Sequence, residues 1–262
     1  MNKVFKFLLP ALFISAIFVG CSSTPKQYSF QEVIVSQEAE IRTNDKISDE
    51  EQRAIVVFLK ENTNGNMLFR GNTPVSKGIF DYEKFGARLE EAAAKVGKKL
   101  PQNHKVVVVT LLNGLTPKEN EALVAEKEYF QDNVEKGYVI NHPIFGALVS
   151  PNKYPTKIRK KLEKITAPDY MEELTSKIQN LLVTKNDVPI LIYIHCMAGK
   201  DRTGEVVASY NMKYSGISYK DAYADANAVA DRKITNFSKY GLQWYGYYLS
   251  DYEKVTTIGE IK

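Results

Sequence analysis

The chain has 262 residues, of which 44% are hydrophobic and 25% charged, with a formal net charge of +4 at pH 7. This is ordinary globular composition, long enough for one sizeable core and too short for two large domains. The small positive excess gives no argument for binding nucleic acid.

Residues 1–20 differ from the rest of the chain and read MNKVFKFLLPALFISAIFVG. A basic start, an apolar middle and a small residue at the end are typical of a secretory signal peptide. The apolar stretch after Lys6 has only 14 residues and contains Pro10, so a transmembrane helix is the poorer interpretation. Removal of residues 1–20 would take away two lysines and no acid, which lowers the net charge to +2.

The residues around the predicted cleavage site resemble the lipobox of bacterial lipoproteins. Gly20 and Cys21 are followed by small polar residues, although Phe18 stands where leucine is usual. The resemblance implies cleavage before Cys21, lipid on its sulfur, and export to the bacterial cell envelope with a membrane anchor. We expect residues 21–50 to form a polar tether that leads to a folded domain at residues 51–262.

Alternating strands and helices are expected from residue 54 onward. The run KVVVVTLL at 105–112 is typical of a strand buried on both faces. The elements expected in chain order are strands at 54–59 and 67–70, a helix at 80–96, a strand at 105–112, a helix at 117–137 and a strand at 137–144.

The second half continues this alternation after an irregular, basic segment at 145–168. We expect an amphipathic helix at 169–183, a fully apolar strand at 188–195, and helices at 202–216, 218–230 and 236–252. The pattern predicts an α/β fold, with a central, mostly parallel sheet flanked by helices on both faces. Ligands bind beyond the carboxyl ends of the strands in such sheets, and Cys196 follows one of these ends.

The loop after this strand reads CMAGKDRTG and combines a thiol, a glycine and an arginine. If Cys21 is acylated, Cys196 is the one remaining thiol and has no intramolecular disulfide partner. Loop N–H groups and a helix N-terminus form an anion site that also stabilises a thiolate. The Arg202 guanidinium matches two phosphate oxygens. The alternative, a buried filler cysteine before a solvated helix, leaves the spacing of Gly199 and Arg202 unexplained.

The string HCMAGKDRTG resembles the phosphate-binding loop of the cysteine-dependent protein tyrosine phosphatase superfamily, C-x5-R-[ST]. It is most similar to the dual-specificity, phosphoinositide and inositol-phosphate phosphatase branches. LFRGNTP at 68–74 is similar to the arginine-containing strand that opens such domains, and the likeness extends over roughly residues 65–250. The resemblance implies that residues 51–262 form a phosphatase-like catalytic domain with a tyrosine-phosphatase-like fold. It also implies a phosphorylated substrate, and neither a metal nor another cofactor.

The resemblance also assigns roles to residues of the loop. Cys196 would be the nucleophile, Arg202 would bind the phosphoryl oxygens, and Thr203 would hydrogen-bond the sulfur. His195 would brace the loop. The cradle of phosphate-binding groups would consist of Met197, Ala198, Gly199, Lys200, Asp201 and Arg202.

The resemblance leaves the general acid open, because the family places an Asp some 30 residues before the cysteine and residues 145–168 contain no Asp. Asp169 lies 27 residues before Cys196 and is our candidate, with the N-cap of the following helix as its alternative role. Asp201 and Glu163 are the other candidates.

Two further patterns bear on the substrate. Residues 153–164 contain six basic side chains, which form either a solvated helix face or a rim for a polyanion such as an inositol phosphate or phosphoinositide. The aromatic residues at 243–252 fit either core packing or a lipid-facing or substrate-stacking patch. The sequence therefore predicts a phosphatase for phosphoproteins or inositol phosphates, with an inactive phosphate-binding module or a structural envelope lipoprotein as alternatives.

Overall fold

The computed structural model describes residues 55–165 and 168–262. The expected signal peptide, the lipidation site Cys21 and the tether at 21–50 lie outside these residues and stay predictions. Among the described residues, no helix is both long enough and apolar enough to cross a bilayer.

The core of the domain is a five-stranded sheet in the order β1-β2-β7-β5-β6. Only β1 runs antiparallel to its neighbour, so the predicted mostly parallel sheet is confirmed. Its strands are β1 (Val56–Glu61), β2 (Met67–Asn72), β5 (Lys105–Thr110), β6 (Gly137–Asn141) and β7 (Ile190–Cys196). The hairpin β3 (Val75–Ser76) and β4 (Ile79–Phe80), which the sequence did not predict, follows β2.

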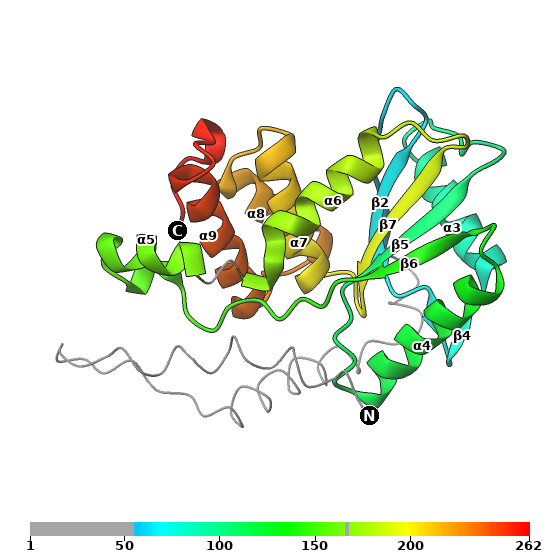
Figure 1. The fold of residues 1–262 in the computed structure, drawn as a ribbon, viewed down its shortest axis with the longest axis horizontal. Helices are drawn as coiled ribbons and strands as arrows, with labels where there is room; N and C mark the ends of the chain where they lie inside the picture. The colour runs from blue at the N-terminus through cyan, green and yellow to red at the C-terminus, as the bar shows by residue number, and fades with distance from the viewer. Residues whose placement is uncertain (1–54, 166–167) are drawn as a thin grey trace. The chain divides into compact units, whose positions relative to one another are not determined.

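Helices cover both faces of this sheet, as predicted (Figure 1). Side chains of β5 alternate between the faces, so Val106 and Val108 pack in one core and Val107 and Val109 in the other. The first core includes α3 (Tyr82–Ala94) and α4 (Pro117–Asp132). The second includes α6 (Met171–Val183), α7 (Asp201–Tyr214), α8 (Tyr219–Ala230) and α9 (Asn236–Asp251).

The segment expected to be irregular contains a helix, α5 (Thr156–Ile165), between the short 3-10 turns η3 (Pro151–Lys153) and η4 (Pro168–Tyr170). Arg159 explains why so polar a sequence folds: it pairs with Glu163 one turn away and stacks on the Tyr247 ring, 3.7 Å from its centre. Charged pairs and cation–π stacking replace the apolar stripe that sequence patterns detect.

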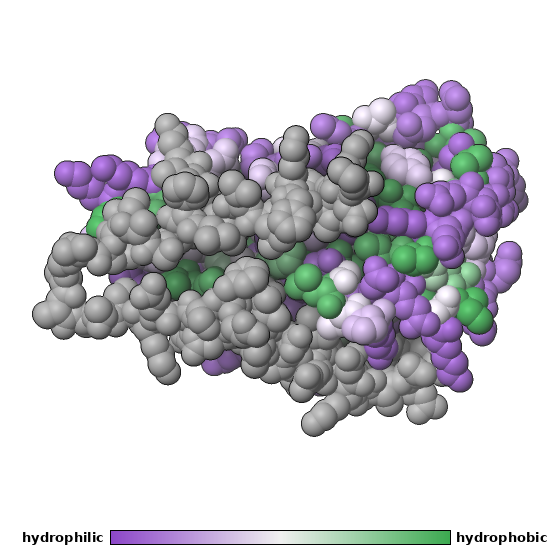
Figure 2. All heavy atoms as spheres, turned by 60° about the horizontal axis from the view of Figure 1, so that its bottom comes forward, coloured by the Kyte–Doolittle hydropathy of each residue, from purple (hydrophilic) through white to green (hydrophobic). Residues whose placement is uncertain are grey.

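Figure 2 shows the lower side of Figure 1 turned forward, with apolar groups set among a larger number of hydrophilic ones. Two aromatic residues of α9 contribute to the interior, since Trp244 and Tyr245 are buried. Core packing, one of the interpretations of residues 243–252, therefore accounts for these two side chains. The last described turn is η5 (Thr256–Ile258), which packs against α9.

Candidate active site

Cys196 is the last residue of β7, and α7 begins five residues later at Asp201. The thiol is buried, and the loop between them turns at Gly199, where φ is +69°. A Cβ at Gly199 would lie 2.4 Å from the carbonyl carbon of Gly71 on β2. Glycine is therefore required both for the backbone angle and for this close approach.

Arg70 holds the same loop from the neighbouring strand β2. Its Nη2 donates to the carbonyl oxygens of Gly199 at 2.9 Å and of Lys200 at 3.4 Å. Burial lowers the pKa of Arg70 to about 10, while the nearby Cys196 acts in the opposite direction. The guanidinium stays charged at neutral pH and fixes these two carbonyl groups. Because the N–H of a trans peptide points opposite to its carbonyl, the N–H groups of Lys200 and Asp201 point away from Arg70.

Arg202 lies in the first turn of α7 with its side chain 12% exposed. Its Nη2 lies 2.5 Å from Oε1 of Glu119, a fully buried carboxylate in the first turn of α4. Oε2 of Glu119 accepts a hydrogen bond from the N–H of Asn113. Sequence patterns did not indicate Glu119, because the favourable interaction with the helix dipole already explains an acid in the first turn of a helix.

His195 is fully buried behind the loop. Its Nδ1 lies 3.3 Å from the carbonyl oxygen of Cys196, and its Nε2 lies 3.2 Å from Oε1 of Glu126 on α4. Thr73 donates to the same carboxylate oxygen at 3.3 Å, and its N–H donates to the carbonyl of Met197. The imidazole therefore occupies a bracing position, and Glu126 is a partner that sequence patterns did not indicate.

Asp169 accepts hydrogen bonds from the N–H groups of Phe145 at 2.7 Å and Gly146 at 2.6 Å. These residues follow β6, whose carboxyl end lies at the same edge of the sheet as that of β7. Burial raises the pKa of Asp169 to about 7, and the two N–H groups and the positive charge of Arg202 oppose this rise. The carboxyl group thus lies within electrostatic reach of Arg202 and can carry a proton near neutral pH.

The alternative role of Asp169 as a helix cap is wrong. Helix α6 begins at Met171, and its N-cap position is occupied by Tyr170, which makes no side-chain cap hydrogen bond. Asp169 has φ +57° and directs its carboxyl group to the loop after β6. The sequence places the residue correctly beside a helix start but does not reveal that the backbone turns away there.

The other two acid candidates have different partners. Arg232 binds both carboxylate oxygens of Asp201, at 2.8 and 2.6 Å, and the N–H of Thr235 adds a third hydrogen bond. Asp201 therefore joins the start of α7 to the loop before α9 and is not placed to donate a proton. Glu163 is bound to Arg159 on α5, a helix that packs on α9 rather than on the sheet.

A model of the tyrosine phosphatase family matches residues 90–232, which is more than half of the chain and includes the loop from Cys196 to Arg202. The chain belongs to this family. A comparison with curated proteins gave no significant match.

Solved structures similar to this tyrosine phosphatase family member share little sequence with it. The core catalytic domain of the PP-IP phosphatase SIW14 from S. cerevisiae is 17% identical, over 75% of this chain and 88% of that one, with a TM-score of 0.41. The kinase associated phosphatase is 15% identical over 77% and 95%, with a TM-score of 0.39. The Yvh1 phosphatase domain from Chaetomium thermophilum is 16% identical over 74% and 96%, with a TM-score of 0.35. At these values, the similarity says nothing about the substrate.

Thr203 lies in the first turn of α7 with its hydroxyl group buried. Within the described part of this phosphatase, the hydroxyl oxygen has no hydrogen-bond partner. The expected bond from Thr203 to the sulfur of Cys196 therefore stays a prediction. Met197 and Ala198 are buried in the loop, whereas Lys200 and Arg202 are partly exposed.

The basic residues at 153–164 are not a rim of this site. Helix α5 lies beside α9 at the end of the domain away from the sheet (Figure 1). Arg159 and Lys160 pair with Asp251 on α9, and Lys157 and Lys161 are exposed. The solvated helix face, which was the other interpretation of these residues, is the better description.

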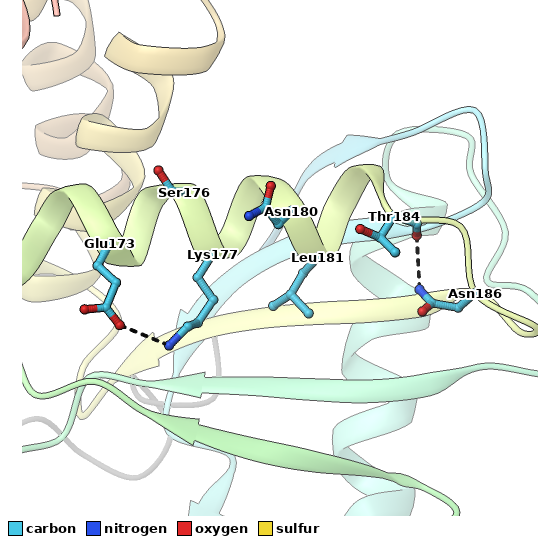
Figure 3. A pocket seen from close by; sticks show the side chains of 7 residues that line it. All are labelled: Glu173, Ser176, Lys177, Asn180, Leu181, Thr184 and Asn186. Carbon is cyan, nitrogen blue, oxygen red and sulfur yellow. Dashed lines mark hydrogen bonds and ion pairs between the residues drawn. The ribbon is translucent and has the colours of Figure 1, made fainter.

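A hollow of about 390 Å³ lies along α6 and the loop that follows it (Figure 3). Glu173 and Lys177 form an ion pair at its edge, and no residue of the phosphate-binding loop lines it. Within 55–165 and 168–262, no group of three or more His, Cys, Asp or Glu side chains is placed to hold a metal ion.

Proposed function

We propose that this member of the tyrosine phosphatase family hydrolyses phosphomonoesters through a phosphocysteine intermediate. In the first step the Cys196 thiolate attacks phosphorus, a P–S bond forms, and the P–O bond to the leaving group breaks. Asp169 gives its proton to the departing oxygen. In the second step water attacks phosphorus and gives a proton to the Asp169 carboxylate, the P–S bond breaks, and inorganic phosphate and the thiolate are released.

The observation that carries this proposal is the position of Asp169 together with its raised pKa. A proton donor for this reaction must lie beside the phosphoryl site and still hold its proton near neutral pH. The positive charge of Arg202 acts on Asp169, and burial nevertheless raises the pKa of Asp169 to about 7. An inactive phosphate-binding module would not require such a proton donor, because no leaving group departs from it.

The loop supplies the remaining chemistry. The first N–H groups of a helix have no acceptor within it, so those at the start of α7 can bind phosphoryl oxygens. Arg202 adds a planar, charged donor, and Glu119 fixes that donor before substrate arrives. Donors held in advance stabilise the charge of the transition state without having to reorganise.

The substrate class rests on the loop alone, because the basic residues of α5 lie elsewhere. Lys200 adds one cation to the mouth of the site, which suits either a phosphotyrosine side chain or an inositol phosphate or phosphoinositide headgroup. We propose these two classes as substrates and expect turnover to rank them.

Phosphate release from the purified protein, measured with EDTA present, tests the proposal. The substrates would be p-nitrophenyl phosphate, a phosphotyrosine peptide, phosphoinositides and inositol hexakisphosphate, each also assayed with Cys196→Ser. Activity that disappears in the variant supports a thiol mechanism, and the most active substrate identifies the class. No release above that of Cys196→Ser on any substrate would contradict the thiol mechanism and leave a phosphate-binding module, which binding of a phosphate analogue would then reveal.

We also propose that the protein is exported and anchored by lipid on Cys21. The support is the signal-like sequence of residues 1–20 and the Gly-Cys pair at its end. An anchored enzyme outside the cytoplasm would act on phosphoesters of the surroundings or of a host cell.

A further inference from the structure

His142 lies directly beside the backbone of Asp169. The residue follows the last residue of β6, and its Nε2 lies 2.6 Å from the carbonyl oxygen of Asp169. Because a carbonyl oxygen only accepts hydrogen bonds, Nε2 must carry the proton and donate it. This contact is separate from the two hydrogen bonds that the Asp169 carboxyl group accepts from Phe145 and Gly146.

The backbone that His142 contacts is strained. Asp169 has φ +57° and the next residue, Tyr170, has φ +51°, although neither is glycine. A residue with a side chain is strained in the left-handed region, and it persists there only where its surroundings hold it. Tyr170 is largely exposed and has no side-chain cap bond, so packing around this side chain contributes little.

The support under His142 is firm by contrast. Its N–H donates to the carbonyl of Thr110 at 2.9 Å, which extends the pairing of β6 with β5 by one residue. The Asn141 side chain donates to the carbonyl of Leu112 at 2.9 Å and accepts from Lys127. His142 thus connects a fixed strand end to a strained turn that carries the acid.

We infer that His142 is a positioning residue for proton donation by Asp169. The imidazole holds the Asp169 carbonyl, which fixes the left-handed backbone and so the direction of the carboxyl group. The inference rests on the proposed role of Asp169 as general acid. Neither the charge of His142 nor contact with substrate is required, because the imidazole acts through one donated hydrogen bond.

The test compares leaving groups, because a general acid matters most where the leaving oxygen is basic. Phenyl phosphate releases a phenol about as basic as the tyrosine side chain, whose pKa is about 10, whereas p-nitrophenyl phosphate releases a much weaker base. The quantity measured is kcat/KM, which reports the first chemical step. We expect His142→Phe to lower kcat/KM for phenyl phosphate roughly tenfold or more beyond its effect on p-nitrophenyl phosphate.

Two variants control this result. His142→Gln can place an amide N–H near the position of Nε2, and it should recover most of the phenyl phosphate activity. Asp169→Asn removes the acid itself and gives the full size of the leaving-group effect. Circular dichroism and thermal unfolding identify a variant that fails to fold, in which case the comparison of Gln with Asn at position 142 replaces Phe, since Asn is too short to reach the carbonyl.

The outcomes separate the two proposals. If Asp169→Asn affects both substrates equally, Asp169 is not the general acid and both proposals about it fail. If Asp169→Asn discriminates between the substrates and His142→Phe affects both equally, only the positioning role of His142 is overturned. Discrimination by both variants, with recovery in His142→Gln, is the result that we expect.

Discussion

At the scale of single residues, the titration of Asp169 makes the clearest prediction. The acid works only when protonated, so activity should fall as the pH rises through about 7. Asp169→Asn should abolish this alkaline limb and lower kcat/KM for a phosphotyrosine peptide about 10²–10³-fold. The measurement is the pH dependence of kcat/KM for both proteins, and an unaltered alkaline limb in the variant would assign it to another group.

The same shift has a consequence for stability. Because folding raises the pKa of Asp169 above its ordinary value of 3.8, the folded state favours the protonated form. This contribution to the free energy of unfolding is fully present below about pH 4 and is lost as the pH rises through about 7. Above pH 7, Asp169→Asn should therefore be more stable than the original protein, while at pH 4 the two should differ little, as urea unfolding would measure.

Gly199 gives a second prediction at this scale. Gly199→Ala should destabilise the fold by roughly 1–3 kcal/mol, since alanine is strained at φ +69° and its Cβ meets the backbone of Gly71. Activity should fall further than stability, because the loop would have to move. Gly97→Ala is a matched control, since Gly97 also has positive φ but has open space around it. Equal losses in both variants would mean that the contact with Gly71 does not matter.

The residues that the sequence could and could not predict differ in one respect. Cys196, Arg202 and Gly199 lie within seven consecutive positions, so their spacing alone predicts a phosphate loop. Glu119, Glu126 and His142 come from other elements and meet the loop or Asp169 only through the parallel sheet. An acid in a helix or a histidine after a strand has many ordinary explanations, and only the fold selects one.

At the scale of elements, the ion pair of Asp201 with Arg232 joins α7 to the loop between α8 and α9. Asp201 is buried, so removing its partner leaves a carboxylate without its main counter-charge. Because the Arg232 side chain is 40% exposed, we expect Arg232→Ala to cost about 1–3 kcal/mol, less than for a fully buried pair.

Urea unfolding measures this cost, and Lys233→Ala is the control, since Lys233 is exposed in the same loop. A loss no larger than that of the control would show that the pair contributes little. An Asp201→Asn variant that retained full stability would contradict the account in the same way.

Elements were predicted best where burial is one-sided or complete. The β-branched runs of β5 and β7 and the capped helix α4 follow from local rules. Helix α5 was not predicted, because its contacts with α9 use Arg159 and Lys160, and charged residues in a sequence indicate a solvated surface. The hairpin of β3 and β4 has two residues in each strand, too few for a periodic pattern.

At the scale of the whole molecule, the expected lipid anchor lies outside the residues that the structure describes and needs its own experiment. Cys21→Ser should abolish incorporation of labelled palmitate and move the protein from the membrane fraction to the soluble fraction of the cell. The Cys196→Ser variant should stay in the membrane fraction and serves as the control. Labelling that persists in Cys21→Ser would show that Cys21 is not the lipidated residue.

The central claim is that the phosphoryl group is transferred from the substrate to the sulfur of Cys196. The most direct measurement is rapid quenching of the protein with a ³²P-labelled substrate, followed by location of the label in the chain. We predict label on Cys196, none in Cys196→Ser, and a larger amount in Thr203→Ala if that hydroxyl helps the sulfur to leave. Turnover by an enzyme that never carries label on Cys196, or turnover that survives Cys196→Ser, would contradict the account.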